Sequence, residues 1–194
     1  FSCAWSAGSH TGPAEDPPPL GLTFLGANLQ PVLLLRLLQL ASPSLPIGAY
    51  TYSQGLESAI EKGSVHDENS ARSWISESLE IVADIETPIG WRLLKSFSDR
   101  DIEAVSYWTE YFIAARDTAE FRAETIQMGY SLGKLVTDLN IGDDSLKSIL
   151  QGQPEIPLPT AFACAAEALA VPHDAALLGL LFSLVENQVL ACVK

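Results

Sequence analysis

The sequence predicts an all-α fold, a single-domain helical bundle of roughly seven to nine helices. Apolar residues recur at spacings of three and four along most of the chain. No run alternates apolar and polar residues with β-branched enrichment, and no repeat of fixed length is found. The chain has 194 residues, of which 47% are hydrophobic, which is enough to bury one compact core.

The N-terminal part divides into a leader and a first helix. Residues 1–27 are rich in glycine, proline and small residues, so we expect a poorly ordered leader before a helical domain at 28–194. The chain begins with Phe1, which indicates a fragment or a processed product. The next segment, LQPVLLLRLLQLA, is too short to span a bilayer and carries Arg36 at its centre. It predicts a core helix that ends before Ser42-Pro43.

Cap residues predict the next three helices. Thr51-x-x-Gln54 has capping-box spacing and predicts the start of a short helix that Gly63 closes. Ser70 is a candidate N-cap for the helix that follows. Thr87-Pro88 predicts another start, with threonine as the N-cap and proline at the first helical position, and this helix continues to Phe97.

Polar residues and prolines also mark the remaining boundaries. These boundaries are Ser98 or Asp99, Asp117 or Thr118, Gly142-Asp143-Asp144, and Val171-Pro172. The segments between them include a long amphipathic helix at 118–139 and an apolar final helix at 173–193. A proline-rich loop, QPEIPLP, precedes the segment TAFACAAEALA.

The net charge and the cysteines exclude several classes of function. The formal net charge is −13 with only 11 Lys and Arg residues, which argues against a nucleic acid partner. Cys3, Cys164 and Cys192 form no C-x-x-C pair, so they predict buried thiols in a cytoplasmic protein rather than disulfides or a zinc site. The three histidines are equally dispersed, and we expect neither a metal site nor a cofactor.

Two glycine-containing motifs resemble catalytic loops without matching them. Thr51-Tyr-Ser53-Gln-Gly55 differs from the nucleophile elbow G-x-S-x-G at its first position, and loop residues rather than a strand precede it. Gly129 to Lys134 is one residue shorter than a phosphate loop and lies within a helical pattern. Gly129 and Gly133 are therefore expected to let a neighbouring helix approach closely.

Three groups of polar residues leave structural and functional interpretations open. Tyr50 and Tyr52 alternate on a loop, where they suit either an interface or a core. Arg122, Glu124 and Gln127 lie on the polar side of the long helix, which a solvated face would also explain. Residues 186–188 (ENQ) interrupt an apolar helix, so they need hydrogen bonds either within the bundle or across an interface.

Three separated blocks of the sequence resemble the UreF family of urease accessory proteins. They are LLRLLQLASPSLPIGAYTYSQGLE, FRAETIQMGYSLGKL, and LPTAFACAAEAL with LLGLLFSLVENQVLACVK. The blocks occur in the family's order and cover most of residues 32–194. The first block, with its pattern SPxLPIGxYxYSxGLE, is the most specific.

The resemblance implies a cytoplasmic maturation factor that is not an enzyme. Proteins of this family form homodimers and bind the accessory protein UreD, called UreH in some organisms. Together they recruit the GTPase UreG to apo-urease, so that nickel reaches the urease active site. The resemblance implies no partner in the membrane.

The resemblance also assigns partner-binding residues. Tyr50 matches a family tyrosine that helps anchor a C-terminal segment near the surface that faces UreG. The other residues in matching blocks are given supporting roles; they are Tyr52, Gln54, Gly55, Glu57, Arg122, Glu124, Gln127, Glu186, Asn187 and Gln188. The family continues past the third block with a tail that takes part in UreD and UreG binding. Because this chain ends at Lys194, we expect it to lack that tail.

Two other functions are kept as alternatives. The first is a helical hydrolase that uses Ser53 as its nucleophile. A Ser53→Ala variant tested in a urease-maturation assay would lose activity if Ser53 were the nucleophile, and would keep near-normal activity if the chain were a scaffold. The second is direct nickel storage by the acidic surface or the histidines. Equilibrium dialysis with nickel would test it, since scattered carboxylates should bind only weakly and in a salt-sensitive way.

Overall fold

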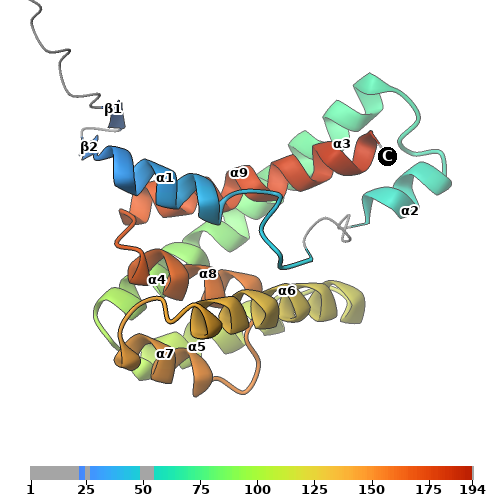
Figure 1. Ribbon diagram of the computed structural model, residues 1–194. Coiled ribbons are helices and arrows are strands. Elements are labelled where there is room, and N and C mark those ends of the chain that lie inside the picture. Colours follow the sequence, from blue (N-terminus) through green and yellow to red (C-terminus); the bar gives the residue numbers. More distant parts are fainter. Residues whose placement is uncertain (1–21, 25–26, 49–54, 194) are drawn as a thin grey trace, which may run out of the picture.

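The described residues, 22–24, 27–48 and 55–193 of a computed structural model, confirm the all-α helical bundle (Figure 1). Two short strands precede the helices, β1 (Leu22–Phe24) and β2 (Ala27–Leu29). They pair antiparallel, with Leu22 opposite Leu29. This pair overlaps the end of the segment expected to be a leader, and it has no counterpart in the sequence-based prediction. Residues 1–21 lie outside the described ranges.

Nine α-helices and one π-helical segment follow within the described residues. They are α1 (Pro31–Leu40), α2 (Leu56–Glu61), α3 (Glu68–Ile81), η2 (Val82–Glu86, π-helical), α4 (Thr87–Ser98), α5 (Ile102–Ala114), α6 (Ala119–Asp138), α7 (Asp144–Gln151), α8 (Leu158–Ala168) and α9 (His173–Cys192).

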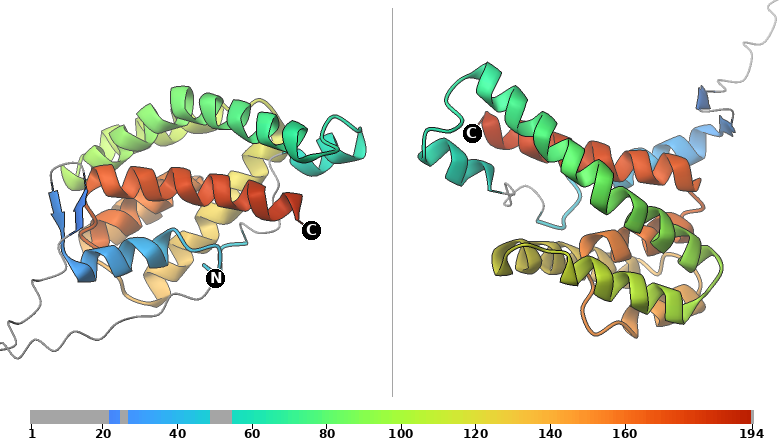
Figure 2. Two further views of the ribbon diagram at one scale, coloured as in Figure 1. Left: turned by 90° about the horizontal axis from the view of Figure 1, so that it is seen from above. Right: turned by 180° about the vertical axis from the view of Figure 1, so that it is seen from behind.

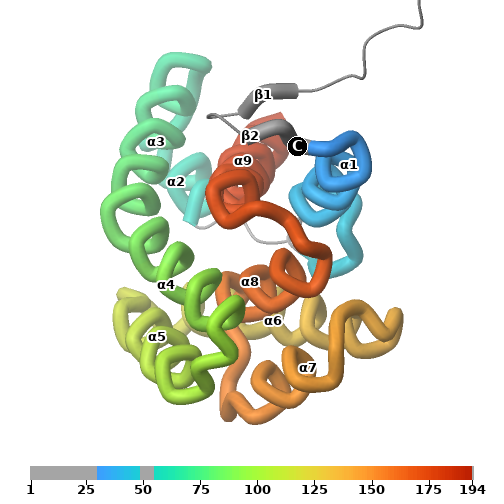
Figure 3. The backbone as a smooth tube through the Cα atoms, turned by 90° about the vertical axis from the view of Figure 1, so that its left-hand side faces the viewer, coloured from blue at the N-terminus to red at the C-terminus, as the bar shows by residue number. Residues whose placement is uncertain are grey.

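Helix α8 is the centre of the core. Every residue from Leu158 to Ala166 is buried, and the segment is rich in alanine, which lets neighbouring helices approach closely. Helices α4, α6, α7 and α9 pack against it, and Figure 3 shows them arranged around α8. The main hydrophobic cluster includes Leu93, Phe97 and Leu132 from the surrounding helices.

Helix α9 lies between α1 and α3 above this core (Figure 2). By length and composition alone, α9 is apolar enough to cross a membrane. Core helices pass the same test, and α9 contacts α1, α2, α3, α4 and α8. Its C-terminal end joins α2 in a second, smaller cluster that contains Leu56, Val65 and Ala191. The bundle therefore has one large core and one small one.

Helix α4 begins at Thr87, as predicted, but η2 joins it end to end to α3, so the predicted N-cap role of Thr87 is wrong. Thr87 has helical backbone angles, φ −60° and ψ −47°, and its N–H donates to the carbonyl oxygen of Val82. Pro88 cannot donate a hydrogen bond, and its ring disfavours a regular α-helical turn before it. The wider π turn accommodates the proline without ending the helix.

The helix caps agree with the sequence in part. Thr118 caps α6 through its side chain, and Gly63 follows the end of α2 with φ +75°, as predicted. Asp67 rather than Ser70 is the N-cap of α3, because Ser70 occupies the third helical position of the capping box. Asp101 caps α5 in place of Ser98 or Asp99, since α4 continues through Ser98.

Two features of the helix boundaries were not predicted. Helix α2 begins at Leu56 with Gly55 as its N-cap at φ +85°, which is later than the Thr51–Gln54 spacing indicates. Thr51 to Gln54 themselves lie outside the described residues. Helix α7 was not assigned, although Asp143 caps it and three buried residues, Leu146, Ile149 and Leu150, lie on one face.

The close approach expected at Gly129 is confirmed, although the approaching chain is the segment before α8 rather than a helix, and Gly133 makes only an ordinary contact. A Cβ atom on Gly129 would lie 2.0 Å from the carbonyl oxygen of Ile156, in the segment that leads into α8. At Gly133 the nearest atom is Cδ2 of Leu150, at 3.4 Å. The hydroxyl oxygen of Thr125 accepts the N–H of Leu158 at 3.2 Å, which fixes the same segment to α6.

Candidate docking site

The sequence-predicted contact residues are divided among three elements. Gly55 is the N-cap of α2 and Glu57 lies in its first turn, while Arg122, Glu124 and Gln127 lie on α6. Residues 186–188 lie on α9. Tyr50, Tyr52 and Gln54 fall outside the described residues, as does Ser53. Residues 42–48 before them form turns and bends, and a nucleophile elbow requires a strand at that place.

A pocket of about 190 Å³ brings two of these groups together, and we call it the η2 pocket. It is formed by the end of α3 and η2, the turn between α5 and α6, and facing parts of α8 and α9. Glu124 of α6 and Gln188 of α9 both line it. Its apolar wall contains Ile81, Val82, Ile85, Phe112, Phe121, Met128, Leu158, Leu180 and Leu184.

A buried ion pair forms one side of the η2 pocket. The Arg116 guanidinium lies 2.6 Å from a carboxylate oxygen of Glu86, and the two side chains are only 15% and 12% exposed. The guanidinium also lies over the ring of Phe112, with 4.2 Å between its central carbon and the ring centroid. The Nε–H group of Arg116 has no hydrogen-bond partner among the described residues. Arg116 therefore carries one buried donor without a described partner, beside its ion pair.

Glu124 forms the acidic side of the same pocket. Burial raises the pKa of Glu124 above its ordinary value, and the negative charge of nearby Glu57 raises it further. The start of α2 is held close to α6, since a Cβ on Gly55 would lie 3.4 Å from Cζ of Phe121. The left-handed backbone of Gly55 and this approach explain why glycine suits the position. Residues of the first and second sequence blocks thus meet at this pocket.

The remaining candidate residues do not line the pocket. Arg122 pairs with Glu155 at 2.6 Å on the surface, and the side chain of Gln127 is exposed. On α9, oxygen atoms of Glu186 and Asn187 are buried without hydrogen-bond partners among the described residues. Gln188 is buried at 5% exposure and faces the pocket. The ENQ segment therefore provides one residue of the pocket rather than three.

Glu86 and Arg116 were missed in the sequence. Glu86 precedes Thr87-Pro88, where a helix boundary was expected, and Arg116 follows the end of α5. Their pairing spans 30 residues of sequence and depends on η2, which no residue pattern indicated. An oppositely charged pair at such a separation gives no local periodic pattern from which it could have been found.

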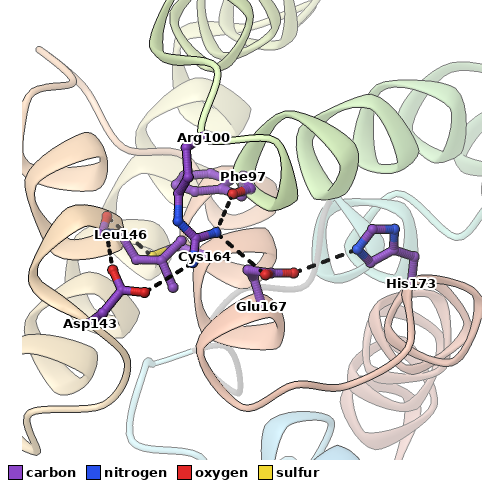
Figure 4. A network of polar contacts seen from close by, with 7 residues as sticks. All are labelled: Phe97, Arg100, Asp143, Leu146, Cys164, Glu167 and His173. Carbon is purple, nitrogen blue, oxygen red and sulfur yellow. Dashed lines mark hydrogen bonds and ion pairs between the residues drawn. The ribbon is translucent and has the colours of Figure 1, made fainter.

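A second polar cluster, away from the η2 pocket, joins four helices of the bundle (Figure 4). Arg100, with φ +57°, donates to Asp143 at 3.0 Å, to Glu167 at 3.4 Å and to the carbonyl oxygen of Phe97 at 2.5 Å. Glu167 also lies 3.6 Å from His173. The backbone N–H of Leu146 lowers the pKa of Asp143, and the Arg100 guanidinium lowers it further. Since each charge has a partner, this cluster stabilises the packing of α4, α7, α8 and α9.

Cys164 lies beside this cluster and is a structural residue. Burial raises the pKa of the thiol to about 12, and its Sγ atom lies 3.8 Å from the carbonyl oxygen of Leu146. A thiol in this environment is a poor nucleophile and a poor metal ligand. No group of three or more His, Cys, Asp or Glu residues in the described ranges could hold a metal ion.

The helical fold and its pocket place the chain in the class of all-α proteins without an evident catalytic group among the described residues. Comparison with known proteins identifies the family. The UreF family model matches residues 65–194, and the chain belongs to the UreF family of urease accessory proteins. It is an accessory protein of urease and not an enzyme.

Named relatives support this assignment over a longer part of the chain. The chain is 71% identical over 161 residues to the urease accessory protein UreF of Nitrosospira multiformis, covering 83% of this chain and 71% of the relative. It is 66% identical over 167 residues to the protein of the same name from Janthinobacterium sp. (strain Marseille), covering 86% and 74%. The UreF of Azoarcus sp. (strain BH72) is 49% identical over 164 residues, covering 83% and 70%.

Proposed function

We propose that this chain is a cytoplasmic adaptor in urease maturation. In this role it binds the accessory protein UreD (UreH in some organisms) and recruits the GTPase UreG to apo-urease for nickel insertion. Family membership supports this role. The observation that carries it is the η2 pocket, where Glu124 from the second family block and Gln188 from the third line one cavity, close to Glu57 from the first block.

Co-purification tests the adaptor role directly. The chain is expressed with UreD and UreG from the same operon, beside a version extended to the length of its relatives. Retention of UreD and UreG by at least one version supports the proposal. If neither version retains UreD, the adaptor role is wrong, and the family assignment describes the fold alone.

Blocking the pocket tests whether partners dock there. Ile85 lines the pocket and is 45% exposed, so Ile85→Trp would fill its mouth without disturbing a fully buried residue. Leu139→Trp is the matched control, because Leu139 is exposed at the end of α6 and does not line the pocket. We expect only Ile85→Trp to lose partners. Equal retention by both variants would place docking elsewhere.

We also propose that the chain forms a homodimer through apolar residues left exposed in the described structure. Val32, Leu35 and Leu38 are exposed on α1. Helix α9, beside α1, exposes Phe182. Large apolar side chains left exposed on neighbouring helices support an interface. Light scattering coupled to size-exclusion chromatography should give a dimer mass for the wild type and a monomer mass for Leu35→Glu.

A further inference from the structure

The η2 pocket has the size of a side-chain site. Pockets for drug-sized ligands occupy roughly 300–1,000 Å³, whereas this one has about 190 Å³. Its mouth is bordered by Ile81 and Ile85, which are 61% and 45% exposed. Exposed apolar residues around a small cavity suit a single inserted side chain in a protein interface.

The charges lining the pocket favour a cation. Glu86 and Arg116 neutralise each other across 2.6 Å. Two further acidic residues line the pocket, Asp117 and Glu124, and neither forms an ion pair with a described residue. Glu57 adds negative charge close to Glu124. An anion would meet this repulsion, and an apolar group would dehydrate Glu124 without compensating its charge.

We infer that the η2 pocket receives a lysine or arginine side chain of a partner protein, with the carboxylate of Glu124 as the group that it meets. This inference rests on the proposed adaptor role. The aliphatic part of such a side chain would pack against Ile81, Ile85 and Phe121. Its charged end would reach Glu124 in surroundings where water is partly excluded, which strengthens the attraction.

Binding measurements with Glu124→Gln test this inference. The wild type, Glu124→Gln and the control Glu120→Gln are titrated with each partner that co-purifies. Glu120 lies on the same helix but is exposed and does not line the pocket. We expect Glu124→Gln to bind about tenfold more weakly or worse, and Glu120→Gln to bind within about twofold of wild type. Unchanged or tighter binding by Glu124→Gln would overturn the inference.

A second measurement does not depend on the partners. N-acetyl-lysine amide and its uncharged isostere N-acetyl-norleucine amide are added to the wild type and followed by nuclear magnetic resonance. We expect the lysine compound alone to shift the signals of Glu124 and Thr125, and Glu124→Gln to abolish the effect. Equal responses to the two compounds, or none, would contradict a basic occupant. If the lysine compound binds but no partner does, the adaptor role fails while the cation pocket stands.

Discussion

Thr87 donates both its backbone N–H and its hydroxyl group to the carbonyl oxygen of Val82, five residues earlier, with the hydroxyl oxygen 3.2 Å away. This double contact closes the π turn immediately before Pro88. The helix can therefore continue past a residue that offers no donor.

Thr87→Val would test the contribution of that hydroxyl group. Valine keeps the shape of threonine and removes one hydrogen bond to a half-buried carbonyl, so we expect the free energy of unfolding to fall by about 1 kcal/mol. Urea unfolding would measure the change. Thr137→Val is the control, because Thr137 bonds the carbonyl oxygen of Gly133 within a regular α-helix. An unchanged free energy of unfolding in Thr87→Val, beside a loss in Thr137→Val, would show that the π turn does not depend on the Thr87 hydroxyl group.

Gly129→Ala should be the most damaging of the small substitutions. The new methyl group would lie 2.0 Å from the carbonyl oxygen of Ile156 and 2.4 Å from the carbonyl carbon of Pro157, and backbone atoms cannot rotate away. We expect a loss of at least about 3 kcal/mol in unfolding free energy, at the upper end of overpacking costs.

Gly133→Ala provides the matched comparison one helical turn later. Its methyl group would lie at an ordinary contact distance of 3.4 Å from Leu150, and alanine is the better helix former. We expect a change within about 1 kcal/mol, in either direction. Similar melting temperatures for the two variants would contradict the close packing of the Ile156–Leu158 segment on α6.

Glu124→Gln should stabilise the folded protein at neutral pH. The pKa of Glu124 is raised in the folded state, so the protonated form stabilises the fold at low pH and this contribution is lost as the pH rises through that pKa. Glutamine is neutral at every pH. We expect a gain of up to about 1 kcal/mol at neutral pH, limited because the carboxylate is only half-buried.

The pH dependence provides the check on that prediction. Thermal unfolding of wild type and Glu124→Gln should differ most at neutral pH and converge as the pH falls below the ordinary carboxyl range. A wild type that is more stable than the variant at neutral pH would mean that Glu124 is paired within the fold.

Cys164 should resist alkylation in the native protein. Its thiol is fully buried, and burial raises its pKa to about 12, whereas Cys192 is half-buried. Because the thiolate is the reactive form, iodoacetamide at about pH 8 should modify Cys192 well before Cys164. Peptide mapping by mass spectrometry would follow both sites, with the unfolded protein as the control. Equal native rates would mean that the α7–α8 contact opens readily.

The sequence predicted those helix ends that are determined by the chemistry of a nearby cap residue. Thr118 has a free hydroxyl before an apolar pattern, and Gly63 supplies a left-handed residue after one, so both ends were located. At Thr87-Pro88 the start of α4 was located, but Thr87 was wrongly taken as an N-cap, because a proline that opens a helix and a proline after a π turn have the same local pattern. Helix α7, with eight residues, was too short for its period to be recognised.

The sequence predicted some residues of the candidate site, but it did not predict how they are arranged in space. The family blocks contained Glu124 and Gln188, which line the η2 pocket, and Arg122 and Gln127, which do not. Which side of a helix faces a cavity depends on the packing of elements distant in sequence. Arg116 became part of the site because η2 orients Glu86 towards it, and this contact follows from the tertiary structure alone.

The continuous helix from α3 to α4 has a mechanical consequence. Helix α3 contains no fully buried residue, whereas α4 contributes Leu93, Leu94 and Phe97 to the main core. The α4 end of this helix is thus held more firmly than the α3 end; Figure 2 shows the course of the helix. A force applied to α3 would be transmitted along the continuous helix towards α4. The helix would bend most readily at η2, because the hydrogen-bond register there already departs from that of an α-helix. Residues of η2 also line the η2 pocket, so bending of the helix at η2 would change the width of the pocket mouth.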